Sequence, residues 1–424
     1  MRKMRDSGVE WIGQIPVDWK LSKIKHHFSI SSGTTPKSDE PQYWDGDIVW
    51  ITPADFKTDD VFVSKGHRNL SQEGYRVSSL QLVPAGSIIF SKRAPIGQVV
   101  INAIDLCTNQ GCLTAVLNDD SNVRFYRYVM SIATEEFELA GSGTTFKEIS
   151  ATRFENILLP LTSKQEQTKC ADYLDSKCSK IDVIIEKQQA IIEKLKEYKF
   201  SIINEAVTQG INPDVNMKQS GYKWIGNIPK HWNMVYAKQL FSQRKDRAFE
   251  DDEQLTASQK YGIISQKEFM DIEGRQVMQV LKGEEILKHV EKGDFVISMR
   301  SFQGGLEYSE VSGKISSAYV MLIPNRDKVY DRYYKWLFKS KKYISALQGT
   351  SNLIRDGQAL RFSNFVQVYL PSLDLDEQKQ IADYLDDICL KIDNEIEKRE
   401  KLLGKVMEYK KSLIYEVVTG KKEV

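Results

Sequence analysis

Apolar residues recur at alternating intervals of four and three positions along two segments of the chain. In residues 166–207, which contain no proline or glycine, this spacing begins at Leu174, Cys178 and Ile181. It is typical of a coiled-coil seam, because it keeps one narrow apolar stripe along a helix. The same spacing returns 211 positions later, from Leu385 onward. The pattern predicts two helices of about 35 residues, or roughly 50 Å each.

Polar residues also occupy matching places on the two seams, Gln188 with Arg399 and Lys199 with Lys410. Two equal seams in one chain are expected to pack on each other, and an antiparallel pair related by a pseudo-two-fold axis is the simplest arrangement. Two independent amphipathic helices, each docked on its own globular unit, are the alternative. The residues expected on the coiled-coil seam are Leu174, Ile181, Ile185, Ile192, Leu195, Ile202, Leu385, Ile392, Ile396, Leu403, Val406 and Leu413.

The two helices belong to a tandem repeat. Residues 160–208 align without gaps on residues 371–419, and 24 of the 49 positions are identical. SGVEWIGQIPVDW at residues 7–19 recurs as SGYKWIGNIPKHW at residues 220–232. Such self-similarity indicates two copies of one structural frame. The predicted segments are two globular units at residues 1–160 and 220–371, and two helices, the first with its linker, at residues 161–219 and 372–424.

The tryptophans of the repeated motif are Trp11 and Trp19 in the first copy and Trp224 and Trp232 in the second. We interpret them as anchors that hold the start of each globular unit on its domain or on the helices. Stacking on nucleic-acid bases is the alternative.

Short β-type runs stand between turn signals in both globular units. This pattern predicts an α+β fold with two mixed α/β domains separated by two long helices that pack as an antiparallel coiled coil. The expected strands are residues 47–51, 87–91, 98–101, 113–117, 294–298, 318–323 and 366–370, and the expected short helices are residues 125–131 and 333–347.

Polar loops between these strands are the candidate binding surfaces. Gly, Ser, Thr, Asn, Arg and Lys on loops suit phosphate oxygens and base edges. Ordinary surface loops are polar too, but polar loops at matching places in two divergent copies favour recognition. The candidate nucleic-acid-binding residues are Thr34, Thr35, Lys37, Thr52, Asp55, Lys92, Arg93, Thr144, Thr145, Lys147, Arg300, Ser301, Gln303, Asn352 and Arg355.

Composition narrows the functional classes. The chain has 424 residues, 41% hydrophobic and 28% charged, with 59 basic and 58 acidic residues and a net charge of +1. These values fit a globular chain and exclude a strongly basic tail or a disordered acidic chain. Residues 1–160 carry 17 basic and 19 acidic groups, whereas residues 220–371 carry 23 and 17. Only the second globular unit therefore has a basic excess.

No apolar run is long enough for a membrane span and no secretory signal opens the chain, so a cytoplasmic location without membrane contact is expected. The five scattered cysteines fit a reducing compartment without a disulfide framework. No zinc-ligand spacing, P-loop, AdoMet-binding motif, metal-nuclease pattern or serine-nucleophile motif occurs. We therefore predict no catalytic residue, no metal site and no cofactor bound by this chain.

Three features together make the chain resemble the specificity subunits of Type I restriction–modification systems. They are WIGxIPxxW at the start of both globular units, GSIIFSKRAPIG at residues 86–97 with the later NQG at residues 109–111, and the repeated helix with its ADYLD sequence. The resemblance covers essentially the whole chain, and its tandem arrangement is more specific than any single motif. ISSAYV at residues 315–320 stands where the second NQG would be, so that loop is not equated residue by residue.

This resemblance implies a DNA-binding function. Each globular unit would be a target recognition domain that reads one half of a bipartite, asymmetric site in double-stranded DNA. The helices would space these domains and bind two methyltransferase subunits, which methylate adenine with AdoMet. Restriction subunits, motor–nucleases that use ATP and Mg²⁺, would join for cleavage. The chain itself would be non-catalytic.

Two other interpretations remain. The chain could be the specificity part of a fused or stand-alone restriction enzyme, which the arrangement of the catalytic subunit would reveal. It could also be a scaffold with two peptide- or protein-binding lobes. A gel shift on random duplex, with and without the partner, separates that scaffold from a DNA-binding subunit.

Overall fold

The computed structural model describes the chain except for residues 1, 58–59, 144–146, 275–285, 299–300 and 351–359. The described chain forms two compact units. Unit 1 comprises residues 1–189 and 401–424, and unit 2 comprises residues 190–400. Each of the two long helices contributes one half to each unit.

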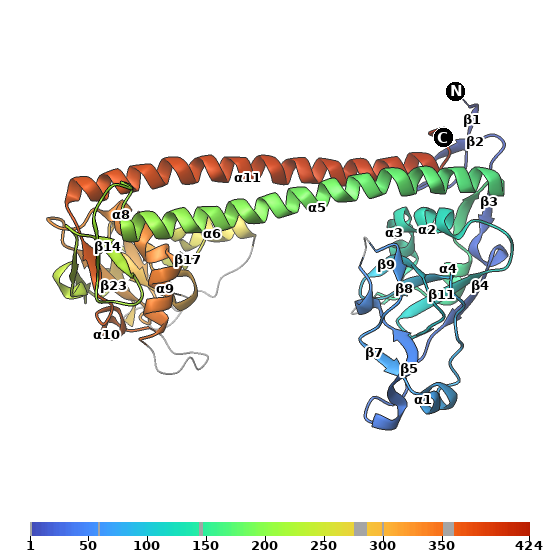
Figure 1. Cartoon of the computed structure of the whole chain (residues 1–424), viewed down its shortest axis with the longest axis horizontal. Coiled ribbons are helices and arrows are strands. Elements are labelled where there is room, and N and C mark those ends of the chain that lie inside the picture. The colour runs from blue at the N-terminus through green and yellow to red at the C-terminus, as the bar shows by residue number, and fades with distance from the viewer. Residues whose placement is uncertain (1, 58–59, 144–146, 275–285, 299–300, 351–359) are drawn as a thin grey trace. The chain divides into compact units, whose positions relative to one another are not determined.

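The two long helices are α5 (Lys164–Gln209) and α11 (Leu375–Val418). In unit 1, Cys170 near the start of α5 contacts Val417 near the end of α11, with 3.9 Å between Sγ and the carbonyl oxygen. In unit 2, Lys199 Nζ lies 2.6 Å from an oxygen of Asp393. The helices therefore run antiparallel in each unit, as predicted, and Figure 1 shows α5 in green beside α11 in red.

A second ion pair shows how the repeat is built into this packing. In unit 1, Lys410 of α11 pairs with Asp182 of α5. The 211-residue shift between the repeats maps Asp182 onto Asp393 and Lys199 onto Lys410. The two ion pairs therefore exchange under the repeat, as a pseudo-two-fold arrangement requires.

Most apolar residues of the seam become part of the core of one of the two units. Those that are buried are Leu174, Ile181, Ile192, Ile202, Leu385, Ile392 and Leu413. Those that are half-buried are Ile185, Leu195, Ile396, Leu403 and Val406.

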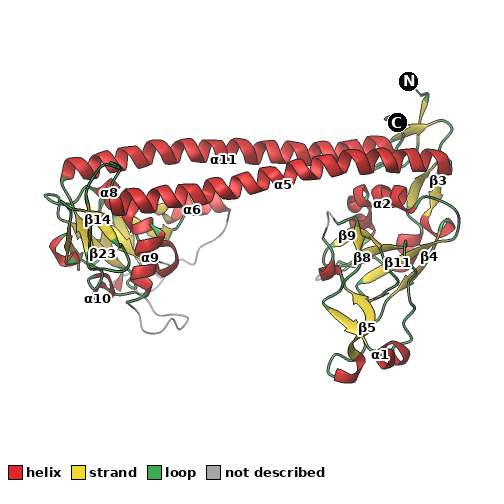
Figure 2. Ribbon diagram, in the orientation of Figure 1, coloured by secondary structure: helices red, strands yellow, loops and turns green. Residues whose placement is uncertain are grey.

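The globular domain of unit 1 is built on a five-stranded sheet with the order β4-β11-β8-β9-β6 (Figure 2). Strand β8 is apolar on both faces, because Ile88 and Phe90 pack in the main core while Ile89 packs in a smaller cluster on the other face. A second sheet has the order β10-β5-β7, and β1 pairs with β2 and β3 with β12.

The strands of unit 1 are β1 (Met4–Asp6), β2 (Gln14–Pro16), β3 (Lys20–Lys23), β4 (Phe28–Ser32), β5 (Trp44–Ile51), β6 (Phe62–Val63), β7 (Arg68–Leu70), β8 (Ile88–Lys92), β9 (Ile96–Asn102), β10 (Cys107–Thr108), β11 (Cys112–Leu117) and β12 (Leu158–Leu161). Its short helices are α1 (Gln72–Val77), α2 (Val123–Ile132), α3 (Thr134–Ala140) and α4 (Ala151–Glu155). The four strands and the helix predicted for this unit are all present.

Unit 2 repeats the frame with a four-stranded sheet of order β16-β23-β20-β21. Its strands are β13 (Met217–Gln219), β14 (Asn227–Pro229), β15 (Asn233–Val235), β16 (Phe241–Arg244), β17 (Leu255–Ser258), β18 (Gly262–Ser265), β19 (Lys288–Val290), β20 (Phe295–Ile297), β21 (Glu307–Tyr308), β22 (Gly313–Ile315), β23 (Val320–Pro324) and β24 (Leu370–Ser372). Its short helices are α6 (Gln266–Glu273), α7 (Ser301–Gly304), α8 (Asp331–Lys339), α9 (Lys341–Gln348) and α10 (Phe362–Phe365).

Two predictions for unit 2 need correction. The helix predicted at residues 333–347 is two helices, because Ser340 is extended and its hydroxyl caps α9 by accepting from Tyr343 N. The strand predicted at residues 366–370 is wrong, since the strand there, β24, begins only at Leu370. Val366 and Val368 are buried in the core of unit 2 without joining a sheet. The alternation of apolar residues before Leu370 therefore reflects burial in the core and not pairing in a sheet.

In each unit, a tryptophan of the repeated motif packs against the end of a long helix. Trp232 is fully buried beside Gly210, which follows α5, and Trp19 is buried beside Gly420, which follows α11. Both glycines are left-handed, with φ of 79° and 70°, as helix C-caps favour. The motif of the first copy thus packs against the helix of the second copy. The interpretation of these tryptophans as anchors is confirmed.

One buried glutamine ties each globular domain to the start of its long helix. Gln378 accepts a hydrogen bond from Tyr330 N at 2.8 Å and donates to the carbonyls of Lys328 and Leu373 at 2.8 and 2.9 Å. Gln167 has the matching place in unit 1, where it accepts from Asn122 N at 2.8 Å and donates to the carbonyl of Thr162 at 2.9 Å. Buried side-chain amides are normally hydrogen-bonded, and in Gln378 both N–H groups and the amide oxygen have a partner.

We predict that Gln378→Leu lowers the free energy of unfolding by about 1–3 kcal/mol, because it leaves partly buried backbone groups of Tyr330, Lys328 and Leu373 unpaired. Urea denaturation of the full chain measures this. Gln380→Leu is the matched control, since Gln380 is exposed two positions further along α11. Equal losses in the two variants would contradict the role given to Gln378.

Candidate nucleic-acid interface

In unit 1, three polar loops meet at one edge of the main sheet because of its antiparallel register. Ser32 at the end of β4 faces Leu113 at the start of β11, and Cys112 faces Ser91 near the end of β8. The loops that leave β4 and β8 and the loop that enters β11 are therefore neighbours. We call this edge, with those three loops, the loop edge of unit 1.

The loop after β4 is held by its backbone. Thr34 N donates to the carbonyl of Thr108 at 3.0 Å, and the indole of Trp50 donates to the carbonyl of Thr34 at 3.1 Å. A Cβ atom on Gly33 would lie 1.9 Å from the same Thr108 oxygen, so the chain can pass here only as glycine. The side chain of Thr34 remains exposed as a result.

The neighbouring positions continue this arrangement. The indole of Trp44 donates to the carbonyl of Lys37 at 3.1 Å, while the Lys37 side chain is exposed. Thr35 bonds to Gln110 of the NQG segment, which links the loops on either side of the edge. The edge thus presents Thr34 and Lys37 outward from a fixed backbone. A polar hollow beside them is lined by Ser31, Ser32, Thr34, Ser79, Gln81, Thr108 and Thr114.

The side chain of Asp55 points into the loop after β5 and binds other residues of the protein. Its carboxylate accepts from Thr52 N at 2.7 Å, Thr52 Oγ1 at 2.8 Å and His67 N at 2.8 Å, and it contacts the His67 ring. Burial alone would raise the pKa of Asp55, but the hydrogen bonds from His67 and Thr52 outweigh it and lower the pKa below its ordinary value. The Asp55 side chain is 3% exposed and that of His67 is 80% exposed.

His67 is therefore the outward-facing group of this pair, although it is not among the residues predicted from the sequence. A single histidine without a motif gives no signal in the sequence. Only the hydrogen bonds from His67 to Asp55 in the structure show that His67 lies beside this loop.

The basic residues after β8 share one carboxylate. Lys92 Nζ lies 2.9 Å from Glu148 Oε1, and a guanidinium nitrogen of Arg93 lies 3.6 Å from Glu148 Oε2. The Lys92 side chain is largely buried, whereas Arg93 is partly exposed and Lys147 is exposed. Arg93 and Lys147 are thus the cations that this part of the loop edge offers to a ligand. The candidates Thr144 and Thr145 lie outside the described residues.

Unit 2 brings the corresponding loops together. Arg244 at the end of β16 faces Met321, and Ile297 at the end of β20 faces Val320 at the start of β23. The loops that follow β16 and β20 and the ISSAYV segment before β23 therefore meet at one edge, which we call the loop edge of unit 2. ISSAYV occupies the place that NQG has in unit 1.

Two of the candidates in unit 2 are described at this edge. Ser301 is fully buried and accepts from Ser298 N at 2.8 Å, so its hydroxyl holds the turn after β20. Gln303 is exposed. The candidates Arg300, Asn352 and Arg355 lie outside the described residues.

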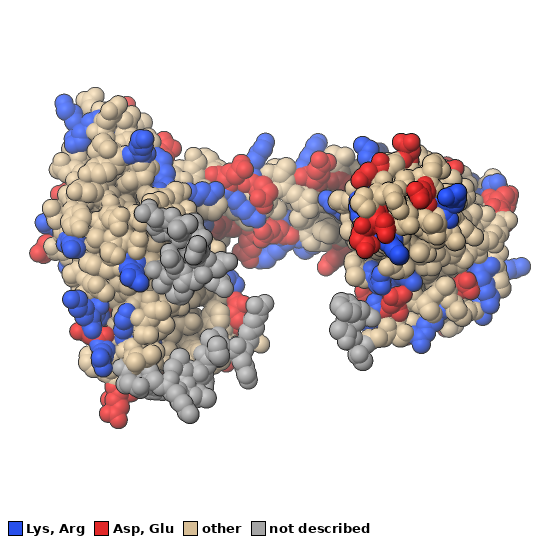
Figure 3. All heavy atoms as spheres, turned by 90° about the horizontal axis from the view of Figure 1, so that it is seen from below, with Lys and Arg blue, Asp and Glu red and all other residues tan. Residues whose placement is uncertain are grey.

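The loop of residues 245–254 was not selected from the sequence. It follows β16 as the loop with Thr34 and Lys37 follows β4, and it carries the exposed cations Lys245 and Arg247. Its sequence, KDRAFEDDEQ, shares no motif with its counterpart, so only the strand register shows the correspondence. On the face drawn in Figure 3, basic side chains are spread over unit 2, at the left, while acidic and basic side chains are intermixed on unit 1.

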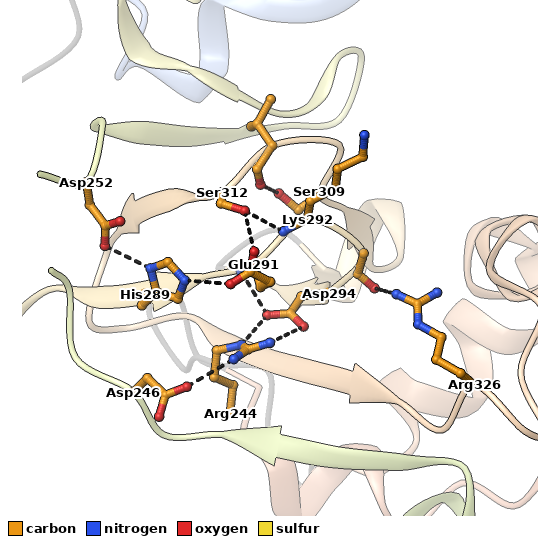
Figure 4. Close-up of polar contacts among 12 residues, drawn as sticks. Arg244, Asp246, Asp252, His289, Glu291, Lys292, Asp294, Ser309, Ser312 and Arg326 are labelled. Atoms are coloured by element: carbon orange, nitrogen blue, oxygen red, sulfur yellow. Dashed lines mark hydrogen bonds and ion pairs between the residues drawn. The ribbon is translucent and has the colours of Figure 1, made fainter.

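A charged network holds this loop of unit 2 (Figure 4). Arg244 Nε donates to Asp294 at 2.6 Å and another of its nitrogens donates to Asp246 at 3.0 Å. The His289 ring lies between two carboxylates, 2.8 Å from Asp252 and 3.1 Å from Glu291. The network joins both ends of the loop to the strands beneath it.

The carboxylates on both sides of His289 shift its pKa. Burial disfavours the imidazolium, but the hydrogen bonds to Asp252 and Glu291 outweigh it and raise the pKa of His289 above its ordinary value. The bond from His289 in turn lowers the pKa of Glu291. A raised histidine pKa stabilises the folded state most below the ordinary value of about 6.5, and this contribution is lost as the pH rises through the raised value.

We predict that unit 2 loses stability as the pH rises above about 6.5, and that His289→Gln makes this loss smaller by removing the titrating group. Urea denaturation at several pH values, followed by a probe in unit 2, measures the change. His26→Gln is the control because His26 is exposed. An unchanged pH slope in His289→Gln would show that the network does not depend on this proton.

Membrane-spanning helices and metal clusters are two other classes of feature that the described residues lack. None of the helices in that part of the chain is long and apolar enough to cross a membrane. Within the same residues, no cluster of three or more His, Cys, Asp or Glu side chains could hold a metal ion. The five cysteines are unpaired and buried.

Comparison with known proteins gives a consistent result. A family model described as the Type I restriction modification DNA specificity domain matches residues 16–197 and 229–403. The MjaIX specificity subunit of a Type I restriction enzyme from Methanocaldococcus jannaschii is 35% identical over 190 residues, 43% of this chain and 43% of that relative. The putative MjaX specificity subunit of the same organism is 27% identical over 201 residues, 46% and 44% of the two chains. The chain therefore covers less than half of the length of these two relatives.

Solved structures share the fold. A chain from a structural study of complex assembly and conformational transition in the type I R-M system superposes with a TM-score of 0.70 at 13% identity, covering 96% of this chain and 99% of that one. The HsdS subunit from Thermoanaerobacter tengcongensis gives a TM-score of 0.52 at 13% identity, covering 98% and 100%. At these identities the likeness concerns the fold alone.

Proposed function

The chain belongs to the Type I restriction–modification DNA specificity family, and on that premise we propose that it selects the DNA site on which such a complex acts. The globular domains of the two units, here called recognition domains, each read one half of a bipartite, asymmetric site. The two long helices set the spacing of the half-sites and bind two methyltransferase subunits. The chain itself is non-catalytic.

The repeated loop edge is the observation that carries this proposal. Corresponding strands, β4, β8 and β11 in unit 1 and β16, β20 and β23 in unit 2, bring three loops together in each unit. The loops differ in sequence between the units although the frame is the same. Contacts to phosphates position a protein on DNA, and contacts to base edges specify the sequence. One frame with two sets of loop side chains therefore suits two different half-sites.

The long helices support the second part of the proposal. The ion pairs Lys199–Asp393 and Asp182–Lys410 exchange under the repeat, so the two helix segments pack on each other in the same way in each unit. The helix segments keep 24 of 49 residues identical between the repeats, whereas the loops diverge. Two like helix surfaces suit two copies of one partner.

The chemistry belongs to the partners in this proposal. The methyltransferase subunits supply AdoMet and methylate adenine, which they reach by turning the base out of the duplex. Restriction subunits that use ATP and Mg²⁺ join the complex for cleavage. The residues of this chain contribute binding and orientation.

We predict that deletion of this gene from its source organism removes adenine methylation at one bipartite sequence motif. Sequencing that detects modified bases, with and without the gene, measures this and supplies the target. Restoring the gene on a plasmid is the control and should return the motif. If the partners are expressed and methylation stays unchanged, the proposed function is wrong.

A second prediction concerns the loop edge of unit 1. Replacing both Lys37 and Lys147 by alanine in the assembled methyltransferase complex should weaken DNA binding and reduce the salt slope of the affinity by about one per lost phosphate contact. Fluorescence anisotropy on a duplex with the mapped site measures both. Lys25→Ala is the matched control, because the exposed Lys25 lies before β4, at the opposite end of that strand. An equal effect of Lys25→Ala would place the interface elsewhere.

A further inference from the structure

We propose that Arg124 and Arg332 are positioning residues that fix the direction in which each recognition domain projects from its long helix. Through that direction they restrict the spacing between half-sites that the complex accepts. The inference rests on the proposed function for its DNA readout, but its structural part can be tested without DNA.

In unit 1 the arginine lies on α2 and binds two carboxylates of α5. One terminal nitrogen of Arg124 lies 2.7 Å from Asp172 Oδ1, and the other donates to Asp175 Oδ2. The second oxygen of Asp175 accepts from the Tyr128 hydroxyl at 2.8 Å. Because Asp172 and Asp175 are three positions apart, they lie on one face of α5, one turn from each other. We call this group the arginine clamp of unit 1.

Unit 2 contains the same clamp on α8 and α11. Arg332 donates to Asp383 at 2.7 Å and, through Nε, to Asp386 at 2.8 Å. The second oxygen of Asp386 accepts from the indole nitrogen of Trp336 at 2.7 Å. Asp383 and Asp386 are the repeat counterparts of Asp172 and Asp175.

The spacing along the chain makes this recurrence informative. The carboxylates of the two clamps are 211 positions apart, whereas the arginines are 208 positions apart. The recognition domains therefore differ in length between arginine and helix, yet both rebuild the same contact. The hydroxyl of Tyr128 and the indole of Trp336 also take the same place, since each donates to the second oxygen of an aspartate that the arginine binds. Both units contain the arginine–aspartate contact although the domain sequences around it differ, which favours a specific role for this contact.

The clamps are placed to orient rather than to stabilise. The side chain of Arg124 is 35% exposed and that of Arg332 is 43% exposed, so each ion pair adds little to the free energy of unfolding. The buried neighbours Phe125 and Val129 already hold α2 in the core. A planar guanidinium bound at two points one turn apart, however, disfavours turning or sliding of the short helix on the long one.

Each clamped helix connects a long helix to a sheet. In unit 1, α2 lies between α5 and the sheet that carries the loop edge (Figure 1). A change in the angle of α2 on α5 would therefore move the loop edge. On DNA, one base pair is a rise of about 3.4 Å and a turn of roughly 35°, so even a modest change of direction alters which spacer fits.

The first test uses the complete methyltransferase complex and duplexes with the mapped bipartite site. Spacers of the native length, one base pair shorter and one base pair longer are compared by initial methylation rate. In Arg124→Ala we expect the preference for the native spacer to fall about fivefold, the scale of a half-exposed ion-pair network. The preference for the correct half-site bases should remain within about twofold, since surface changes away from the bases have little effect.

The controls separate orientation from folding. Arg332→Ala should give the same loss of spacer preference from the other unit, and Arg124→Lys should be intermediate because lysine keeps the charge without the fork. Lys164→Ala should have no effect. Lys164 also joins the domain to α5, through Asp120 at 3.1 Å, but by one point between exposed groups. Equal losses of base and spacer preference would mean a folding defect and would overturn the proposal, as would an unchanged spacer preference.

The second test needs no DNA. Spin labels at Lys65→Cys in the recognition domain and Lys180→Cys on α5 report the distance between the two parts of unit 1, and both positions are exposed. The native cysteines react slowly in comparison, since burial raises the pKa of Cys178 and of Cys107 to about 11. Arg124→Ala should broaden the distance distribution, and Lys164→Ala should not.

The two tests distinguish a failure of the proposed function from a failure of the positioning role of the clamps. If no bipartite methylation exists but the distribution broadens, the proposed function fails and the clamp remains. If methylation follows a bipartite site while the distribution and the spacer preference are unchanged in Arg124→Ala, the clamp has no positioning role and the inference is refuted.

Discussion

The antiparallel seam between α5 and α11 is the interaction on which the rest of the structure depends. Each helix gives one half to each unit, so the core of unit 1 includes Leu413 and Val417 of the second repeat, and that of unit 2 includes Ile202 and Val207 of the first. Apolar residues alone would tolerate a slip of one heptad. The lysine–aspartate pair in each unit opposes such a slip, because a charge in the wrong register loses its partner.

The features that depend on local periodicity could be predicted from the sequence. The heptad spacing and the lysines at matching seam positions predicted the paired helices, and apolar runs such as residues 87–91 predicted the central strands. Features that depend on distant pairing were not accessible. Val366 and Val368 look like a strand but are buried without sheet partners, and residues 245–254 gain their place only from the register of β16 with β23.

The candidate site shows the same limit at the level of single side chains. Threonines and lysines of the loop after β4 could be selected by residue type, and the structure leaves Thr34 and Lys37 exposed. Residue type could not show that the Asp55 carboxylate faces inward or that His67 faces outward in its place. The direction of a loop side chain depends on which donors reach it from other strands, and neither composition nor spacing contains that information.

The packing of the first tryptophan motif against the end of α11 has a consequence for synthesis. Trp19 lies beside Gly420, and the carbonyl of Ile12 accepts from the Tyr415 hydroxyl at 3.0 Å and from Lys421 Nζ at 2.9 Å. A ribosome needs roughly 20–80 s to add the intervening residues, at about 5–20 residues per second. During that time the nascent first unit exposes the apolar surface that α11 will cover. A chain cut short before residue 401 would leave that surface open permanently and would be a substrate for chaperones and proteases.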